Sequence, residues 1–429
     1  MKTLQTTLFA CLGLGATTAI ASANAFNVNE HDAQVTGRAG AVAASDTDAS
    51  SIVFNPGGIA VNEGTQVAVT GTVYAAGGSY EDATGKTETD SPPAVVPSAF
   101  ITSRVHDMVA VGIGLHLPYG LALSWPDNHE QADVIQDQSL RTYFISPVVG
   151  LNLHKQVPGL SIGAGVDIVP ATIELENAVR FGDTSGTAKL GGDAIGIGAR
   201  VGVMYHPPSV QGLKLGVMYR SPVKLNFEGK GDFDIADPYR SQLPPDGDIK
   251  ASITLPQTIW GGVAYSPIPN LEAELNAVFI NWAQTWENGD LTVELPGGAE
   301  TSSAQDYKNT VTWRLGVQYG LPQYQAAIRA GFIYDPTPIP TTTLTARLPD
   351  INRVDLTIGG SKMFGQYGVH AGFLVVIPGE RETSDALYAP AYKATYGVSA
   401  LVFSLGVTGH FGATTPPPAP VGEPAVAKR

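Results

Sequence analysis

The residues most able to do covalent or metal chemistry are Ser161, eight histidines and one cysteine. Ser161 lies in the stretch Gly159-Leu160-Ser161-Ile162-Gly163, which matches the Gly-x-Ser-x-Gly pattern of a hydrolase nucleophile. That chemistry needs a sharp turn from a strand into a helix, whereas this stretch begins a run of alternating residues. The histidines show no pair at metal-ligand spacing, and Cys11 lies in the apolar N-terminus. The sequence therefore predicts no catalytic site, no metal and no cofactor, and we expect a protein that is not an enzyme.

A second kind of chemistry is open to two cations between Tyr307 and Tyr319. In this stretch every second residue is apolar or aromatic, while Lys308 and Arg314 share the opposite face with uncharged polar residues. Side chains alternate across a β-strand, so the pattern predicts a strand between lipid and water. At roughly 3.3 Å per residue and a tilt near 40°, the two tyrosines would lie on the order of 30 Å apart along a membrane normal. An inward cation could hold the acid head group of a ligand, or it could pair with an inward aspartate.

The same alternation recurs in about 14 segments from about residue 66 to residue 411. Short turns and longer loops, the latter including residues 176–190 and 283–306, alternate between them, as in an outer-membrane barrel with an even number of strands. A soluble sandwich, the alternative, would not need this regularity. No later stretch has about 18 uninterrupted apolar residues, but a closed barrel can span a membrane because closure pairs every backbone group. We therefore predict an all-β fold, a transmembrane antiparallel β-barrel of about 14 strands in the bacterial outer membrane.

The two ends of the chain differ from this pattern. Residues 1–25 read as a signal peptide, with Lys2, an apolar core and small residues at Ala21, Ala23 and Ala25. Cleavage after Ala23 or after Ala25 fits, and we favour the second, which makes Phe26 the first mature residue. We expect residues 26–64 to form a plug, or hatch, inside the lumen, residues 65–411 to form the barrel, and the proline-rich residues 412–429 to form a disordered periplasmic tail.

The net charge of −14 is spread without a basic stripe, which disfavours nucleic-acid partners. A general porin or an adhesin barrel is the remaining rival. An open aqueous pore fits poorly with an apolar plug of about 40 residues. The composition therefore favours a closed, selective channel.

Four blocks of residues resemble the FadL/TodX family of outer-membrane transporters for long-chain fatty acids and other hydrophobic compounds. They are Phe26-Asn27-Val28-Asn29-Glu30 with Gly37-Arg38-Ala39-Gly40; Phe54-Asn55-Pro56-Gly57; Leu117-Pro118-Tyr119-Gly120-Leu121; and the stretch from Tyr307 through Asp335-Pro336-Thr337-Pro338 to Asn352-Arg353. The resemblance covers nearly the whole mature chain. It implies a fourteen-stranded, hatch-plugged barrel that contacts outer-membrane lipid and passes a hydrophobic small molecule by diffusion, and we expect a monomer.

The family's route runs from the outer loops to a pocket in the barrel and then sideways through a kinked third strand. Here the kink would be Pro118-Tyr119-Gly120, because Pro118 cannot donate a ladder hydrogen bond; the alternative is that these residues simply end a strand. The resemblance makes Asn55-Pro56-Gly57 the hatch motif, where a plain turn is the alternative reading. Gly57 stands where the family has Ala.

The resemblance also suggests ligand-binding residues. It implies that Phe26 reaches into the pocket and that Lys308 lies near a ligand head group, with Arg314 as a second inward cation. An arginine expected to accompany Lys308 falls at Thr172. That departure weakens the fatty-acid reading and keeps aromatic or other neutral hydrocarbons open as ligands.

Overall fold

The computed structural model describes residues 24–45, 48–383 and 392–412. Residues 1–23 of the expected signal peptide lie outside the described residues. So does the expected proline-rich tail beyond Gly412.

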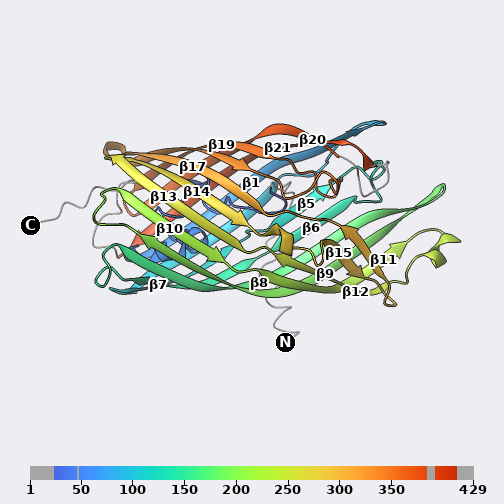
Figure 1. Ribbon diagram of the computed structural model, residues 1–429, viewed down its shortest axis with the longest axis horizontal. Coiled ribbons are helices and arrows are strands. Elements are labelled where there is room, and N and C mark those ends of the chain that lie inside the picture. Colours follow the sequence, from blue (N-terminus) through green and yellow to red (C-terminus); the bar gives the residue numbers. More distant parts are fainter. Residues whose placement is uncertain (1–23, 46–47, 384–391, 413–429) are drawn as a thin grey trace, which may run out of the picture.

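The wall of the molecule is one closed antiparallel β-sheet (Figure 1). Its first and last strands pair with each other, from Thr65 opposite Phe411 to Glu81 opposite Thr395, so the described sheet has no free edge there. In six cases, two consecutive strands are the two parts of a single crossing of the wall. In addition, β2 only extends the outer end of β1. The 21 strands therefore make fourteen crossings, which confirms the predicted fold class.

The described strands and helices have the following bounds. The first half of the wall contains β1 (Thr65–Asp82), β2 (Gly85–Glu88), β3 (Ala94–His106), β4 (Val109–His116), β5 (Gly120–Ser124), β6 (Asp137–Thr142), β7 (Phe144–Asn152), β8 (Leu160–Phe181), β9 (Thr184–Tyr205), β10 (Leu213–Arg220) and β11 (Val223–Asp234). The second half contains β12 (Gly247–Leu255), β13 (Thr258–Ile268), β14 (Leu271–Ile280), β15 (Asp290–Glu294), β16 (Glu300–Ala304), β17 (Thr310–Leu321), β18 (Ala326–Asp335), β19 (Arg353–Phe364), β20 (Tyr367–Glu382) and β21 (Thr395–Phe411). The helices are α2 (Ala33–Thr36), α3 (Ser51–Phe54), η1 (Pro56–Ala60), η2 (Tyr239–Gln242), η3 (Trp282–Gln284) and η4 (Pro322–Tyr324). Among the described residues, none of these helices is long and apolar enough to cross a membrane.

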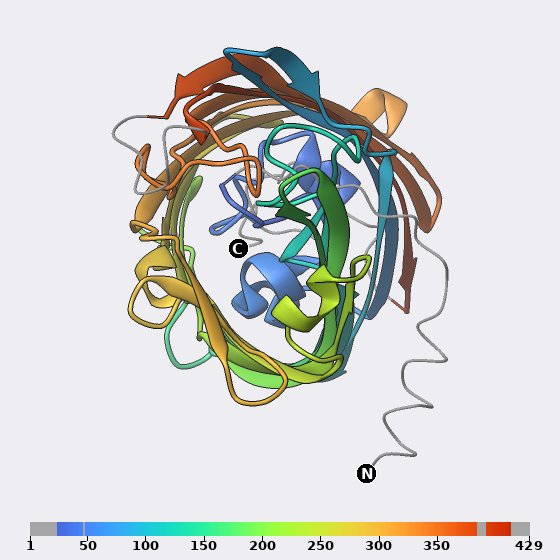
Figure 2. The same cartoon turned by 90° about the vertical axis from the view of Figure 1, so that its right-hand side faces the viewer.

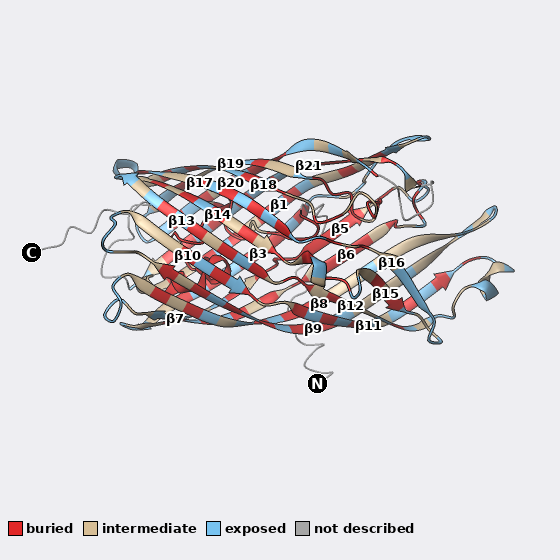
Figure 3. Ribbon diagram, viewed as in Figure 1, coloured by how far each residue is buried: buried red, intermediate tan, exposed pale blue. Residues whose placement is uncertain are grey.

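Burial alternates along the strands, as Figure 3 shows by its red and pale bands. On β17, Thr312 and Arg314 are buried inside while Trp313 and Leu315 are exposed on the outer, lipid-facing side. The alternation expected from Tyr307 is wrong at its first residues. Tyr307 is buried and Lys308 is exposed, because β17 begins only at Thr310 and the chain before it follows a loop.

The connections at one end of the barrel are short and those at the other end are long, as predicted (Figure 1). The loop expected at residues 176–190 is wrong. β8 and β9 stay paired to their tips, up to Phe181 opposite Thr184, and form a long hairpin at the end of the barrel that carries the long connections (Figure 1). The expected loop at residues 283–306 likewise contains the paired strands β15 and β16.

The residues that precede β1 lie inside the barrel (Figure 2). Nearly all described residues from 24 to 60 are buried. Asp32 caps α2, because its carboxylate accepts hydrogen bonds from the Gln34 and Val35 N–H groups, which the first helical turn leaves unpaired. This segment provides one wall of the site described next.

Candidate functional site

The turn Asn55-Pro56-Gly57 lies directly against the barrel wall. The Asn55 Oδ1 accepts the Gly57 N–H at 3.0 Å, and its Nδ2 donates to the Ala43 carbonyl at 2.7 Å and to the Val203 carbonyl of β9 at 3.1 Å. The wall makes room with glycine. A Cβ at Gly163 of β8 would lie 2.1 Å from the Pro56 carbonyl oxygen. The sequence motif is therefore a contact between the interior segment and two strands.

The third crossing of the barrel is broken at Leu117-Pro118-Tyr119. β3 pairs with β4 only from Ala99 onward, and the described pairings include none between β3 and β5. The free peptide groups of the break bond to the interior segment instead: the Val28 N–H donates to the Pro118 carbonyl, and the Gly120 N–H donates to the Phe26 carbonyl, both at 2.9 Å. The chain thus bends into the barrel at Pro118 rather than ending there.

Tyr119 points inward at this bend and is buried. Its hydroxyl donates to the Pro256 carbonyl at 2.9 Å and accepts from Arg220 at 2.9 Å, with the Arg220 guanidinium 4.9 Å from the ring centre. Its ring lies 6.0 Å from that of Phe26. The bend is therefore fixed by side-chain contacts as well as by the two backbone bonds.

An apolar cavity opens beside this bend, and the empty space in and before it amounts to about 490 Å³. Phe26 forms part of its wall and packs edge-on against Trp282, with ring centres 5.0 Å apart. The remaining lining is mostly aliphatic and aromatic, with a few polar groups: Leu121, Gln138, Ser139, Leu140, Ile173, Leu175, Ile253, Trp286, Leu291, Gln305, Tyr307, Arg347 and Leu348. This combination of apolar walls and few polar groups is typical of a small-molecule site.

The structure places the three predicted ligand-binding residues in different surroundings. Phe26 lines the apolar cavity, but Lys308 is exposed and lines neither of the two cavities described here. Arg314 is buried and donates to the Ala39 carbonyl at 3.0 Å, with its guanidinium 5.4 Å from the Trp260 ring centre. Arg314 therefore holds the interior segment and lines a second, more polar cavity.

Sequence reasoning missed most residues of the apolar cavity, among them Arg347 and Trp286. Arg347 belongs to the connection between β18 and β19, and Trp286 to that between β14 and β15. The buried Trp286 Nε1–H has no hydrogen-bond partner among the described residues. Neither residue lies in an alternating pattern, so no sequence signal pointed to them.

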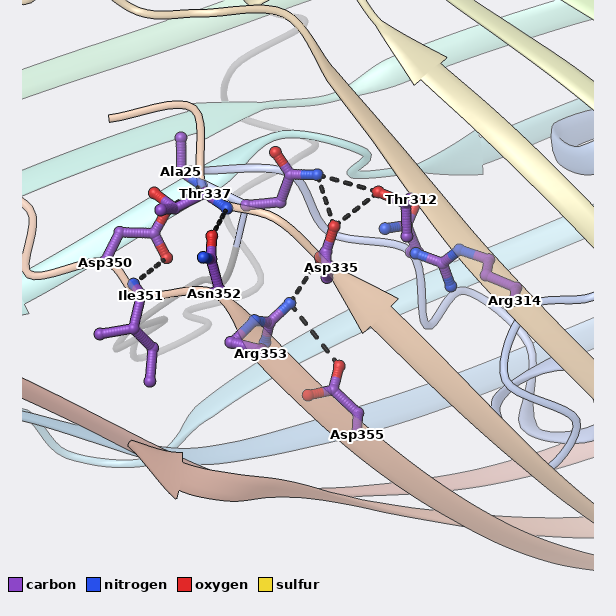
Figure 4. Close-up of polar contacts among 12 residues, drawn as sticks. Ala25, Thr312, Arg314, Asp335, Thr337, Asp350, Ile351, Asn352, Arg353 and Asp355 are labelled. Atoms are coloured by element: carbon purple, nitrogen blue, oxygen red, sulfur yellow. Dashed lines mark hydrogen bonds and ion pairs between the residues drawn. The ribbon is translucent and has the colours of Figure 1, made fainter. Parts of the chain in front are cut away.

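The second cavity lies against the first interior residues. Asn27, Val28, Asn29 and Glu30 line it, together with Arg314, Arg353 and Asp355 from the wall. Figure 4 shows Arg353 between two carboxylates, 2.8 Å from Asp335 and 3.7 Å from Asp355. Within residues 24–45, 48–383 and 392–412, no group of three His, Cys, Asp or Glu side chains could hold a metal.

A closed barrel with apolar strands outside, a folded segment inside and an apolar cavity between them defines an outer-membrane transport protein. Comparison with known proteins gives the family: residues 14–411 match the model for the outer membrane protein transport protein family (OMPP1/FadL/TodX). The chain belongs to this family, and its location is the bacterial outer membrane.

Individual relatives have low sequence identity to this chain but align with most of its length. A long-chain fatty acid transport protein of Escherichia coli O6:H1 is 24% identical, over 84% of this chain and 89% of its own. Among solved structures, a Pseudomonas aeruginosa FadL homologue superposes with a TM-score of 0.81 at 18% identity, over 90% of this chain and all of the other. The toluene transporter TodX of P. putida has a TM-score of 0.72 at 18% identity, covering 90% of this chain and 99% of its own. These structures show the same fold.

Proposed function

We propose that this protein carries hydrophobic compounds passively across the outer membrane, and that the apolar cavity is where the compound rests. The observation that carries the proposal is the cavity itself, which is lined mostly by apolar side chains and has Phe26 of the interior segment in its wall. Burial of apolar surface supplies the driving force for binding, at about 25 cal/mol per Å². No energy source is needed for such a route.

Long-chain fatty acids are the ligand class we favour. The cavity has a cation on its wall, Arg347, together with the Trp286 Nε1–H donor. A guanidinium and an indole N–H can both donate to a carboxylate, and charge-assisted hydrogen bonds in a dry site are strong. Several relatives of this chain are named long-chain fatty acid transport proteins.

Neutral aromatic hydrocarbons are the second candidate. The cavity wall contains the rings of Phe26, Trp286 and Tyr307, which suit an aromatic ligand, and Lys308 is not on this wall. Fold relatives include a structure titled as a toluene transporter. The two candidates differ in whether the ligand needs the cation.

The substitution Arg347→Gln separates the two ligand classes. We expect it to weaken binding of a long-chain fatty acid by about tenfold or more, since a charge-assisted hydrogen bond contributes roughly 1.5–3 kcal/mol. Binding of toluene should change by less than about twofold. Equilibrium binding to purified protein in detergent measures both, with Arg240→Gln, on the distant η2, as the matched control. Equal loss for both ligands would contradict the assignment of Arg347 to a head group.

We further propose that the interior segment acts as the hatch, that residues 26–64 and 65–411 are the hatch and barrel units, and that the compound leaves sideways at Pro118-Tyr119-Gly120. In support of this, Phe26 reaches into the cavity while its carbonyl holds the Gly120 N–H. A ligand that displaces Phe26 would release the bend in the third crossing. Asn55-Pro56-Gly57, packed on β8 and β9, would keep the rest of the hatch in place during that change.

A further inference from the structure

Asn24 is held inside the barrel by hydrogen bonds of its side chain and of its carbonyl group. Its side-chain Nδ2 donates to Asp335 Oδ1 at 2.7 Å and to Thr312 Oγ1 at 3.1 Å, and its Oδ1 accepts the Trp282 Nε1–H at 2.6 Å. Its carbonyl accepts the Asn27 N–H at 3.2 Å. The donors and the acceptor of this amide side chain are therefore all hydrogen-bonded. That would be unusual for a residue removed with the signal peptide.

Asp350 supplies a second observation at the same place. It is fully buried, and Figure 4 shows it beside Ala25, whose N–H donates to its Oδ2 at 3.0 Å. Its other hydrogen bonds come from the Thr337 hydroxyl and the Ile351 N–H, and within the described part of the chain it has no ion pair. Burial raises the pKa of this carboxyl above its ordinary range. A buried carboxylate is stable when a cation lies close by.

We propose that the signal peptide is removed between Ala23 and Asn24, so that Asn24 is the first mature residue and its α-ammonium group supplies a cation beside the buried Asp350. Ala21-Ser22-Ala23 supplies the small residues that this cleavage needs. Cleavage after Ala25 would instead leave Asp335 Oδ1 and the buried Trp282 indole without these partners and remove the N–H bound to Asp350. The new terminus then fixes Phe26, two residues later, in the apolar cavity.

The first test is N-terminal sequencing and intact mass of the protein purified from outer membranes. We expect the mature chain to begin at Asn24. A chain that begins at Phe26 would overturn the proposal. This result needs no ligand and does not depend on the proposed function.

The second test uses Asn24→Asp, which keeps the size of the side chain but places a carboxylate against Asp335. If Asn24 is retained, the variant should melt at a lower temperature and bind a long-chain fatty acid about tenfold more weakly, because buried groups lose their partners. If Asn24 is removed with the signal peptide, the mature variant is identical to the wild type and nothing changes. Asn128→Asp, at an exposed loop position, is the matched control for charge.

The variant Trp282→Phe completes the test, since it removes the indole N–H that Asn24 accepts. Its effect on melting temperature should not add to that of Asn24→Asp, because the two residues share one hydrogen-bonded group. Strict additivity would overturn the contact. The change in melting temperature by itself tests whether Asn24 is retained and hydrogen-bonded in the mature protein. A changed melting temperature with an unchanged affinity for the fatty acid would count only against the proposed function.

Discussion

The substitution Gly163→Ala should release the hatch without damaging the barrel. A Cβ at this position would lie 2.1 Å from the Pro56 carbonyl oxygen, 2.2 Å from its carbon and 2.7 Å from the Gly57 nitrogen. Ordinary contacts begin near 3.4 Å, so the turn would have to move by roughly 1 Å. Overpacking of this kind costs about 1–3 kcal/mol. A change of that size shifts the balance between seated and displaced turns by about 5- to 150-fold.

Liposome swelling with small sugars measures the consequence. We expect faster sugar entry with Gly163→Ala than with the wild type, because a displaced turn leaves water-filled space between the segment and β8. The matched control is Gly261→Ala on β13, where an added Cβ meets nothing within 4 Å. Heat-dependent gel mobility shows whether each variant is folded. Sugar entry that is no faster than in the control, in a folded protein, would refute the assignment of the turn as a seal.

Two further outcomes are expected for the route of the ligand. Phe26→Ala should weaken ligand binding by about tenfold, because the side chain contacts Trp282 and lines the cavity; Phe364→Ala, at the exposed end of β19, is the control, and calorimetric titration is the measurement. Replacing both Pro118 and Gly120 with Val should lower uptake of hydrophobic compounds by cells without lowering surface expression, whereas the exposed Pro147→Val should not; unchanged uptake in the double variant would argue against a sideways exit.

The wall of the barrel was predictable because alternation with period two is set by lipid on one side and the lumen on the other. Predictions from this alternation were wrong where the strand no longer has lipid on one side and the lumen on the other. In the outer part of the β8–β9 hairpin burial no longer alternates, and a loop was expected there, but the two strands still pair. The alternation also fails at Tyr307 and Lys308, where the chain is not yet a strand. Period alone does not mark where a strand leaves the membrane.

The candidate site was predictable only in part, for a related reason. Phe26, Asn55 and Pro118 were identified through resemblance, and the missing N–H of Pro118 made a break in the strand physically plausible there. Arg347 comes from a connection that folds back into the barrel, and its position depends on contacts with distant elements, such as its hydrogen bond to the Val134 carbonyl. Loop residues carry no periodic signal, so their place in a cavity is not readable from the sequence.

The interior residues 26–28 connect two events that transport must couple. Phe26 lines the apolar cavity, and the same short stretch makes the two backbone hydrogen bonds that hold Pro118 and Gly120 inward. Each such bond contributes about 1 kcal/mol net, so releasing both costs about 2 kcal/mol. Burial of about 80 Å² of apolar ligand surface supplies that amount at 25 cal/mol per Å². In the proposed route, burial of a hydrophobic ligand of ordinary size therefore supplies enough free energy to open the bend by competing with Phe26, whereas burial of a small polar solute does not.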